Sequence, residues 1–235
     1  MLTGAGVSTE SGIPDFRSPG GLWAEFDPLE YGSLAAFRGD PEKVWRFYAP
    51  RFSMLADARP NAAHEAIAEL ERRGLVDAVI TQNIDLLHER AGSRDVIEVH
   101  GSIRTSTCPA CGTVHDLAEV VELIAPRAPH CRNCGAVLKP DVVFFGEELP
   151  VAAINRAFEL AAAARLLLVV GSALEVYPVG GLPLETVRAG GSVAIVNRGP
   201  TAFDGRAALR LEGSAGEILA ATIAALDADE EAANA

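Results

Sequence analysis

Apolar positions along the chain predict an alternation of amphipathic helices and buried strands. Residues 61–73 carry apolar side chains at helical spacing, with Gly74 as a stop signal, and further helices are predicted at 151–164, 181–189 and 215–226. Short apolar runs indicate buried strands at 75–80, 96–99, 166–170 and 192–196. Because helices separate these strands, the sequence predicts an α/β fold with a mostly parallel, Rossmann-like sheet covered by helices on both faces.

Three stretches interrupt this alternation. Residues 15–58 are rich in aromatic residues, proline and glycine, and we expect them to form a lid or a helical insert. Residues 102–140 contain all four cysteines and indicate a small separate module, so the main domain would comprise residues 1–101 and 141–235. The acidic tail at 227–235 is expected to fray.

Composition narrows the class of protein. A chain of 235 residues with 49% hydrophobic residues can bury a sizeable core. Its formal net charge of −12 argues against nucleic acid as a partner, because phosphate backbones are bound by lysine and arginine, and it suits a basic partner such as a lysine-rich peptide. The chain shows no signal peptide and no apolar run long enough to span a bilayer, so we expect a soluble, cytoplasmic protein without a membrane partner.

The cysteines form two close pairs, Cys108-Pro-Ala-Cys111 and Cys131-Arg-Asn-Cys134, separated by 19 residues. Each short turn presents two thiolates, and four thiolates complete the tetrahedral shell of structural zinc. We therefore predict a zinc ion that holds the module together and takes no part in chemistry. A zinc ribbon used only for binding is the alternative. The nearby His115 and His130 are expected to be exposed loop residues.

A glycine-rich segment, Gly4-Ala5-Gly6-Val7-Ser8, opens the chain. Glycines let a pyrophosphate approach the backbone, but they also serve in tight turns that bind nothing. The spacing is not the G-x-G-x-x-G of dehydrogenases, and no acidic residue follows a second strand at the usual distance. Taken alone, this segment leaves both interpretations open.

Polar side chains follow two of the predicted strands. His100 comes directly after the strand at 96–99, and Thr81-Gln82-Asn83-Ile84-Asp85 follows the strand that ends at residue 80. Parallel sheets bind ligands at the carboxyl ends of their strands, and an imidazole can accept a proton near neutral pH. A structural histidine and a helix cap are the alternatives. His64 and His88 fall within predicted helices and are interpreted as structural.

Together these segments resemble the sirtuin family of NAD-dependent protein lysine deacylases, of the bacterial and archaeal type. The resemblance covers nearly the whole chain, and several motifs in one order are far more specific than any single motif. The matching segments are Gly4-Ala5-Gly6-Val7-Ser8, Gly12-Ile13-Pro14-Asp15-Phe16-Arg17, residues 81–85, Val99-His100-Gly101, the two cysteine pairs, Lys139-Pro-Asp-Val-Val-Phe-Phe-Gly-Glu147, Gly171-Ser172 and Val196-Asn197.

The resemblance implies that NAD and an acyl-lysine peptide enter a cleft between the Rossmann-like domain and the zinc module. The implied NAD-binding residues are Gly4, Ala5, Gly6, Thr9, Asp15, Phe16, Arg17, Gln82, Asn83, Ile84, Asp85, His100, Gly171, Ser172, Asn197, Ser214 and Ala215. The implied peptide-binding residues, which would pair with the substrate backbone as an added strand, are Val142, Phe144, Gly146, Glu147, Leu174, Glu175 and Val176.

The reaction of the family transfers the acyl group from lysine to ADP-ribose and releases nicotinamide and O-acyl-ADP-ribose. By resemblance, His100 would be the catalytic base that removes a proton from a ribose hydroxyl, and Asn83 would be a second catalytic residue. Mono-ADP-ribosyl transfer, which shares the cofactor and the opening step, is one alternative. A non-enzymatic NAD sensor is another. We expect a monomer that acts on acyl-lysine proteins or peptides.

Two features depart from the family pattern. The family has a helix and most of a strand before the glycine-rich segment, whereas this chain begins two residues before Thr3, so we expect either a truncated start or weak folding. Tyr48-Ala-Pro-Arg51 matches the spacing of a Tyr-x-x-Arg pair in the branch that removes succinyl or malonyl groups, although Pro50 could shift its geometry. Because residues 12–17 are closer to the deacetylating branches, we predict deacetylation, with Tyr48 and Arg51 binding an acidic acyl group as the alternative.

Overall fold

The computed structural model describes residues 1–16, 18, 20–124 and 128–233, which form two lobes. The larger lobe is built on a six-stranded sheet in the order β3-β2-β1-β7-β8-β9, in which every neighbouring pair is parallel. Its strands are β1 (Leu2–Thr3), β2 (Val79–Thr81), β3 (Val96–Glu98), β7 (Leu166–Val170), β8 (Ser192–Asn197) and β9 (Leu209–Glu212). The predicted parallel α/β fold is confirmed.

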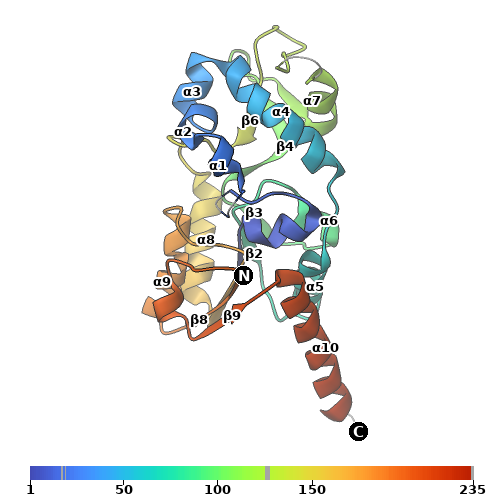
Figure 1. Cartoon of the computed structure of the whole chain (residues 1–235), viewed down its shortest axis with the longest axis vertical. Helices are drawn as coiled ribbons and strands as arrows, with labels where there is room; N and C mark the ends of the chain where they lie inside the picture. The colour runs from blue at the N-terminus through green and yellow to red at the C-terminus, as the bar shows by residue number, and fades with distance from the viewer. Residues whose placement is uncertain (17, 19, 125–127, 234–235) are drawn as a thin grey trace.

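Helices cover both faces of this sheet (Figure 1). The core on one face includes α8 (Val151–Ala163) and α9 (Leu182–Arg188), and the core on the other includes α5 (Ala62–Arg72) and α10 (Ala215–Ala233). Shorter helices are α6 (Leu87–Ala91), η1 (Ala5–Ser11), η2 (Val179–Gly181) and η3 (Asp204–Arg206). Burial on both faces explains why the strands read as continuous apolar runs in the sequence.

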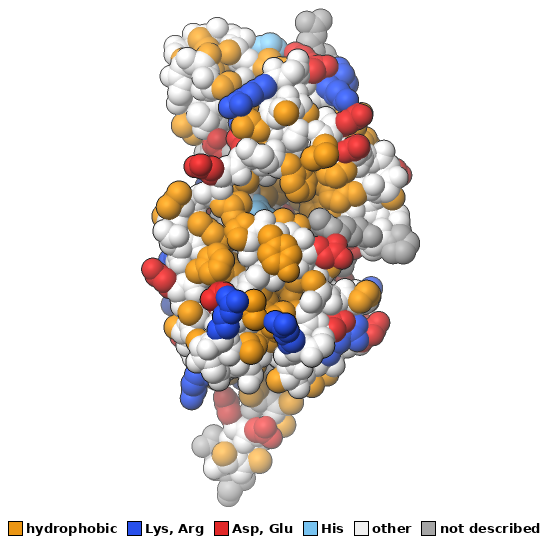
Figure 2. All heavy atoms as spheres, turned by 90° about the vertical axis from the view of Figure 1, so that its left-hand side faces the viewer, with side chains coloured by type: hydrophobic (Ala, Val, Ile, Leu, Met, Phe, Trp, Pro, Cys, Tyr) orange, Lys and Arg blue, Asp and Glu red, His pale blue; other side chains and the backbone are white. Residues whose placement is uncertain are grey.

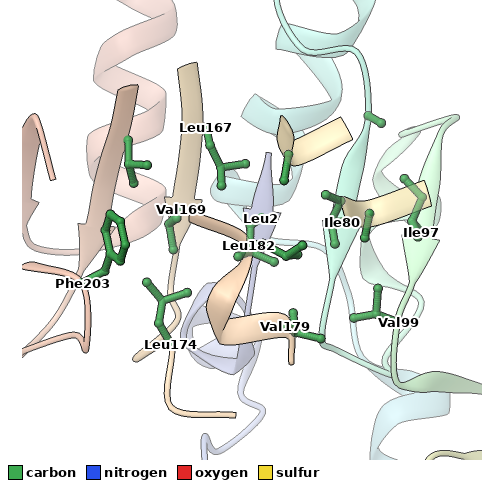
Figure 3. Packing of buried hydrophobic residues seen from close by; sticks show 14 of the residues in the cluster. Leu2, Ile80, Ile97, Val99, Leu167, Val169, Leu174, Val179, Leu182 and Phe203 are labelled. Atoms are coloured by element: carbon green, nitrogen blue, oxygen red, sulfur yellow. The ribbon is translucent and has the colours of Figure 1, made fainter. Parts of the chain in front are cut away.

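The central strand β1 has two residues in this structure, and both are buried. Leu2 pairs with Ile80 of β2 on one side and with Val169 of β7 on the other. Its side chain packs between the side chains of these two residues in the core (Figure 3). Strands β2 and β3 are added on one side of β1, and β7, β8 and β9 are added on its other side. Open parallel sheets bind ligands at such a switch point.

The smaller lobe combines the two stretches that interrupt the pattern of the sequence. Its antiparallel sheet has the order β5-β4-β6, with β4 (Gly101–Thr107), β5 (Val114–Asp116) and β6 (Lys139–Val142). Its helices are α1 (Leu22–Glu25), α2 (Pro28–Tyr31), α3 (Leu34–Gly39), α4 (Pro41–Asp57) and α7 (Leu117–Leu123). Trp45 of α4 is buried among residues of both stretches and donates a 2.6 Å hydrogen bond to the carbonyl of Leu138. The helical insert and the cysteine module therefore share one core.

Two predicted boundaries are wrong. The strand predicted at 75–80 begins only at Val79, because the amide of Leu75 closes the end of α5 by donating to the Leu70 carbonyl, and the Leu75 side chain is 58% exposed. The tail predicted to fray is helical up to Ala233, and Arg73 forms an ion pair of 2.6 Å with Asp227 where the tail begins. Residues 234 and 235 lie outside the described part of the chain. Among the described residues, no helix is long and apolar enough to cross a membrane.

Candidate active site

A cleft of about 870 Å³ lies between the two lobes, lined by residues that follow β1, β2, β7 and β8 on one side and by the smaller lobe on the other. Hydrophobic side chains gather on both sides of this hollow (Figure 2). All but two of the residues predicted to bind NAD or the peptide line it, so the structure brings them together. Ser214 is instead buried and donates a 2.7 Å hydrogen bond to Glu10, which itself lines the cleft. Arg17 lies outside the described residues.

The glycine-rich segment packs against a second glycine turn. The amide of Gly6 donates a 2.8 Å hydrogen bond to the carbonyl of Gly171, and a Cβ atom at Gly6 would lie 2.8 Å from the Gly171 Cα. Gly171 itself has a φ of +63°, and a Cβ atom there would lie 2.2 Å from the amide of Val7. Backbone contact alone therefore requires both glycines. The same close approach leaves a floor without side chains, which a pyrophosphate could reach.

His100 lines the cleft and is held in one ring orientation. Its Nδ1 lies 3.1 Å from the carbonyl oxygen of Gln82. Because a carbonyl only accepts, Nδ1 carries the proton and Nε2 is the acceptor nitrogen of the ring. Burial lowers the pKa of His100 below its ordinary value, an effect that the hydrogen bond to Gln82 only partly opposes. The imidazole is therefore neutral at pH 7 and able to accept a proton.

A hydrogen-bond network centred on Ser8 joins the polar residues after β2. The Ser8 hydroxyl donates to Asp85 Oδ2 at 2.7 Å and accepts from Asn83 Nδ2 at 3.0 Å. Its oxygen also lies 3.4 Å from Nε2 of His64, a buried residue that the sequence suggested was structural. Ser8 and Glu10 line the cleft but were not among the predicted site residues, although Ser8 ends the glycine-rich segment and Glu10 lies two residues after it. Their closeness in the sequence to Gly4 and Gly6 could have indicated that they reach the same site.

Tyr48 and Arg51 both line the cleft, one turn apart on α4. The Tyr48 ring packs against Phe144 with centroids 5.4 Å apart, and burial raises the pKa of its phenol. The Arg51 guanidinium stacks 3.6 Å above the ring of Phe47, and its Nη1 donates to the Phe47 carbonyl. Among the described residues, no hydrogen-bond partner reaches its buried Nε. Helix α4 continues through Pro50, so the proline does not separate the pair.

The segment predicted to bind the peptide backbone runs from β6 along the cleft. The amide of Phe144 donates a 2.8 Å hydrogen bond to Glu147 Oε2. The amide of Val143 donates to the His100 carbonyl at 2.8 Å. A peptide that pairs with this segment as it stands must therefore use other backbone groups than these two amides.

The four cysteine sulfurs lie together, all within 4.8 Å of one another. Cys108 Sγ is 3.4 Å from Cys134 Sγ, and Cys111 Sγ is 3.6 Å from Cys131 Sγ. A tetrahedral zinc ion with Zn–S bonds of ~2.3 Å requires sulfur separations of roughly 3.8 Å, so the set is close to the geometry of a zinc site. Gly112 and Gly135, at φ +73° and +76°, close two matching turns by donating to the carbonyls of Cys108 and Cys131.

His115 differs from its prediction. It lies on β5 and is buried, not exposed in a loop, whereas His130 is exposed as expected. The Nδ1 atom of His115 lies 3.5 Å from Glu119 Oε2, and neither ring nitrogen has a hydrogen-bond partner among the described residues. The alternation of β5 places the His115 side chain on the inner face of the module, between the exposed Val114 and Asp116. Four thiolates still complete the metal shell without it.

The structure defines a class of α/β protein with three features. These are a parallel sheet with a cleft at its switch point, an oriented histidine in that cleft and a separate module with four clustered cysteines. The sequence matches the Sir2 family over residues 4–178, so this chain belongs to the Sir2, or sirtuin, family. The predicted resemblance is thereby confirmed.

Named relatives and solved structures agree with this membership. The chain is 48% identical over 219 residues to NAD-dependent protein deacylase 2 of Pyrobaculum aerophilum. This alignment covers 93% of this chain and 87% of that protein. The chain is 45% identical over 210 residues to the NAD-dependent protein deacetylase of Thermotoga maritima, covering 89% of this chain and 85% of that protein.

Two solved structures have the same fold. A Sir2 variant with a deacetylated p53 peptide and 3′-O-acetyl-ADP-ribose has a TM-score of 0.89 and 43% identity, covering 93% of this chain and 89% of that one. Sir2Tm bound to a propionylated peptide has a TM-score of 0.84 and 41% identity, covering 93% of this chain and 88% of that one.

Proposed function

We propose that this protein is an NAD-dependent protein lysine deacylase, which transfers an acyl group from lysine to ADP-ribose and releases nicotinamide. The observation that carries the proposal is the orientation of His100. Its Nδ1 is held by the Gln82 carbonyl, and its side chain lines the same cleft as Asn83 and Asp85. A neutral base beside a polar pocket suits removal of a proton from a sugar hydroxyl.

NAD, when bound, supplies an electrophilic ribose carbon and nicotinamide as the leaving group. Asn83 and Asp85, held by Ser8, would bind the nicotinamide and its ribose, and His100 would accept the ribose hydroxyl proton at Nε2. The remaining predicted contacts to NAD are Gly4, Ala5, Gly6, Thr9, Asp15, Phe16, Gln82, Ile84, Gly171, Ser172, Asn197 and Ala215 along the cleft, with Ser214 behind it.

The four clustered cysteines would hold zinc as a structural ion. A tetrathiolate site leaves no open ligand position, so the metal supports the smaller lobe and takes no part in the reaction. The substrate would be a protein or peptide whose backbone adds a strand between residues 142–147 and residues 174–176, with its acyl-lysine in the cleft. We further propose a monomeric, cytoplasmic enzyme.

Arg51 supports a second candidate activity, the removal of succinyl or malonyl groups. Its buried Nε has no hydrogen-bond partner among the described residues, and a carboxylate at the end of an acyl chain would satisfy it. Against this, the guanidinium is already stacked on Phe47 and bonded to the backbone of its own helix. Deacetylation therefore stays the primary proposal. The ratio of kcat/KM for acetyl and succinyl versions of one peptide decides between them, and Arg51→Met should remove only a succinyl activity.

The test of the proposed function is mass spectrometry of an acyl-lysine peptide panel incubated with the zinc-loaded protein and NAD. We expect free lysine peptide and O-acyl-ADP-ribose in equal amounts, formed only when NAD is present. Label from NAD appearing on protein would instead indicate mono-ADP-ribosyl transfer. Binding of NAD without any change to the peptides would indicate a sensor and would contradict the proposal.

A further inference from the structure

Lys139, the first residue of β6, makes several polar contacts with the segment that follows it. Its ammonium lies 2.9 Å from Glu147 Oε2 and donates to the carbonyls of Pro140 at 3.0 Å and Val142 at 3.1 Å. The same ammonium lies 4.3 Å from the centre of the Phe144 ring. One side chain thus touches both ends and the middle of residues 140–147.

Glu147 completes a closed loop of contacts. Its Oε2 accepts from the Phe144 amide and also pairs with Lys139. The side chains of Lys139 and Glu147 are only 19% and 20% exposed, so water weakens this ion pair less than it weakens one on the surface. In this structure the Glu147 carboxylate therefore binds groups of its own segment, the Phe144 amide and the Lys139 ammonium, although the sequence suggested that Glu147 contacts the substrate.

The backbone around residues 142–147 is held from two other directions. Val142 pairs with Gly101 at the start of β4. The amide of Phe145 donates to the Gly32 carbonyl, and the carbonyl of Phe145 accepts from the Leu34 amide. These contacts hold the segment to β4 and to the residues at the start of α3, whereas the Lys139–Glu147 pair joins its two ends.

We propose that Lys139 is a positioning residue that holds residues 142–147 in the shape on which an acyl-lysine peptide binds. This inference rests on the proposed deacylase function. Without the ammonium, Glu147 loses its cation, and the carbonyls of Pro140 and Val142 lose a donor. The segment then samples more conformations, and the peptide must restore order when it binds. Among the described residues, the glycine-rich segment and the residues after β2 that are proposed to bind NAD make no contact with Lys139, so the KM for NAD should change little.

The test compares Lys139→Met with Lys139→Arg in steady-state kinetics on one acetyl-lysine peptide. Methionine keeps the apolar stem against Phe144, and arginine keeps the charge opposite Glu147. We expect Lys139→Met to raise the KM for peptide about tenfold, with kcat and the KM for NAD within about twofold of the wild type, and Lys139→Arg to restore most of the loss. Lys43→Met is the matched control, since Lys43 is the only other lysine in the chain and its partner Glu30 is on the surface.

Hydrogen exchange of the backbone provides a second measurement that does not depend on activity. In Lys139→Met and in Glu147→Gln, the amides of residues 143–147 should exchange faster while those of α8 keep their protection. An unchanged KM for peptide together with unchanged exchange in Lys139→Met would overturn the inference. A wild-type protein that deacylates no peptide would instead refute the proposed function, and the exchange result would still decide what Lys139 does to the segment.

Discussion

The hydroxyl of Ser8 donates a 2.7 Å hydrogen bond to Asp85, which joins the glycine-rich opening of the chain to the polar segment after β2. Asn83 donates to the same hydroxyl, so one side chain fixes the orientation of two others. Both are proposed to bind nicotinamide and its ribose. Ser8 is therefore expected to affect catalysis through the residues that it orients.

Replacement of Ser8 by alanine should lower kcat/KM for NAD roughly ten- to hundredfold, because a hydrogen bond to a charged group contributes about 1.5–3 kcal/mol. Steady-state kinetics with varied NAD checks this prediction. Thr222→Ala, on the exposed part of α10, serves as the control and should leave kcat/KM unchanged. A Ser8→Ala enzyme as active as the wild type would show that Asp85 and Asn83 need no orientation from Ser8.

The pH dependence of the reaction should reflect the lowered pKa of His100. Burial favours the neutral imidazole, so the base form persists to a pH below the ordinary value of about 6.5. We expect kcat/KM to stay level from pH 8 to about pH 6.5 and to fall only in more acidic buffer. A loss of activity that begins well above pH 7 would contradict a buried, neutral base.

His88 should make the fold sensitive to acid. Burial lowers its pKa from 6.5 to about 3, with a smaller effect from the His64 ring, whose centroid lies 4.9 Å away. Between these pH values the unfolded chain binds a proton that the folded chain does not. The stabilisation is therefore complete above about pH 6.5 and is lost as the pH falls. The loss from this group reaches about 2 kcal/mol at pH 5.

Denaturant unfolding at pH 7 and pH 5 measures this effect. His88→Gln, which removes the titration but can still bond to Thr3, should reduce the difference in unfolding free energy between the two buffers. His130→Gln, at an exposed site, should not reduce it. An identical difference in the His88 variant and the wild type would mean that other groups carry the acid sensitivity.

Zinc should be required for the smaller lobe and not for the chemistry itself. The wild type should contain one zinc ion per chain by elemental analysis. Cys131→Ser should lose the metal and unfold at a lower temperature, because a structural site contributes its binding energy to folding. His100→Ala should keep the metal. Full zinc content in Cys131→Ser would contradict the tetrathiolate site.

The sequence was most informative where one local rule decided the structure. The spacing of Cys108, Cys111, Cys131 and Cys134 predicted their cluster, because short turns impose the geometry. Helical periodicity likewise located α5 and α8 to within a residue or two. A catalytic role for His100 and Asn83 could be predicted only from the ordered set of motifs, since either residue alone is compatible with a structural role.

Contacts between distant segments could not be predicted in the same way. The pairing of Arg73 with Asp227 joins the end of α5 to α10, across 154 positions of the sequence. The burial of His115 depends on how β5 packs in the smaller lobe, and the Lys139–Glu147 ion pair depends on how the chain turns back between these two residues. None of these relationships leaves a local pattern in the sequence.

The most direct test of the central claim measures O-acetyl-ADP-ribose formed from NAD and an acetyl-lysine peptide by the wild type and by His100→Ala. We predict NAD-dependent formation by the wild type and a loss of roughly 10²–10⁴-fold in the variant, which should still contain zinc. Comparable formation of O-acetyl-ADP-ribose by His100→Ala would contradict the assignment of His100 as the catalytic base.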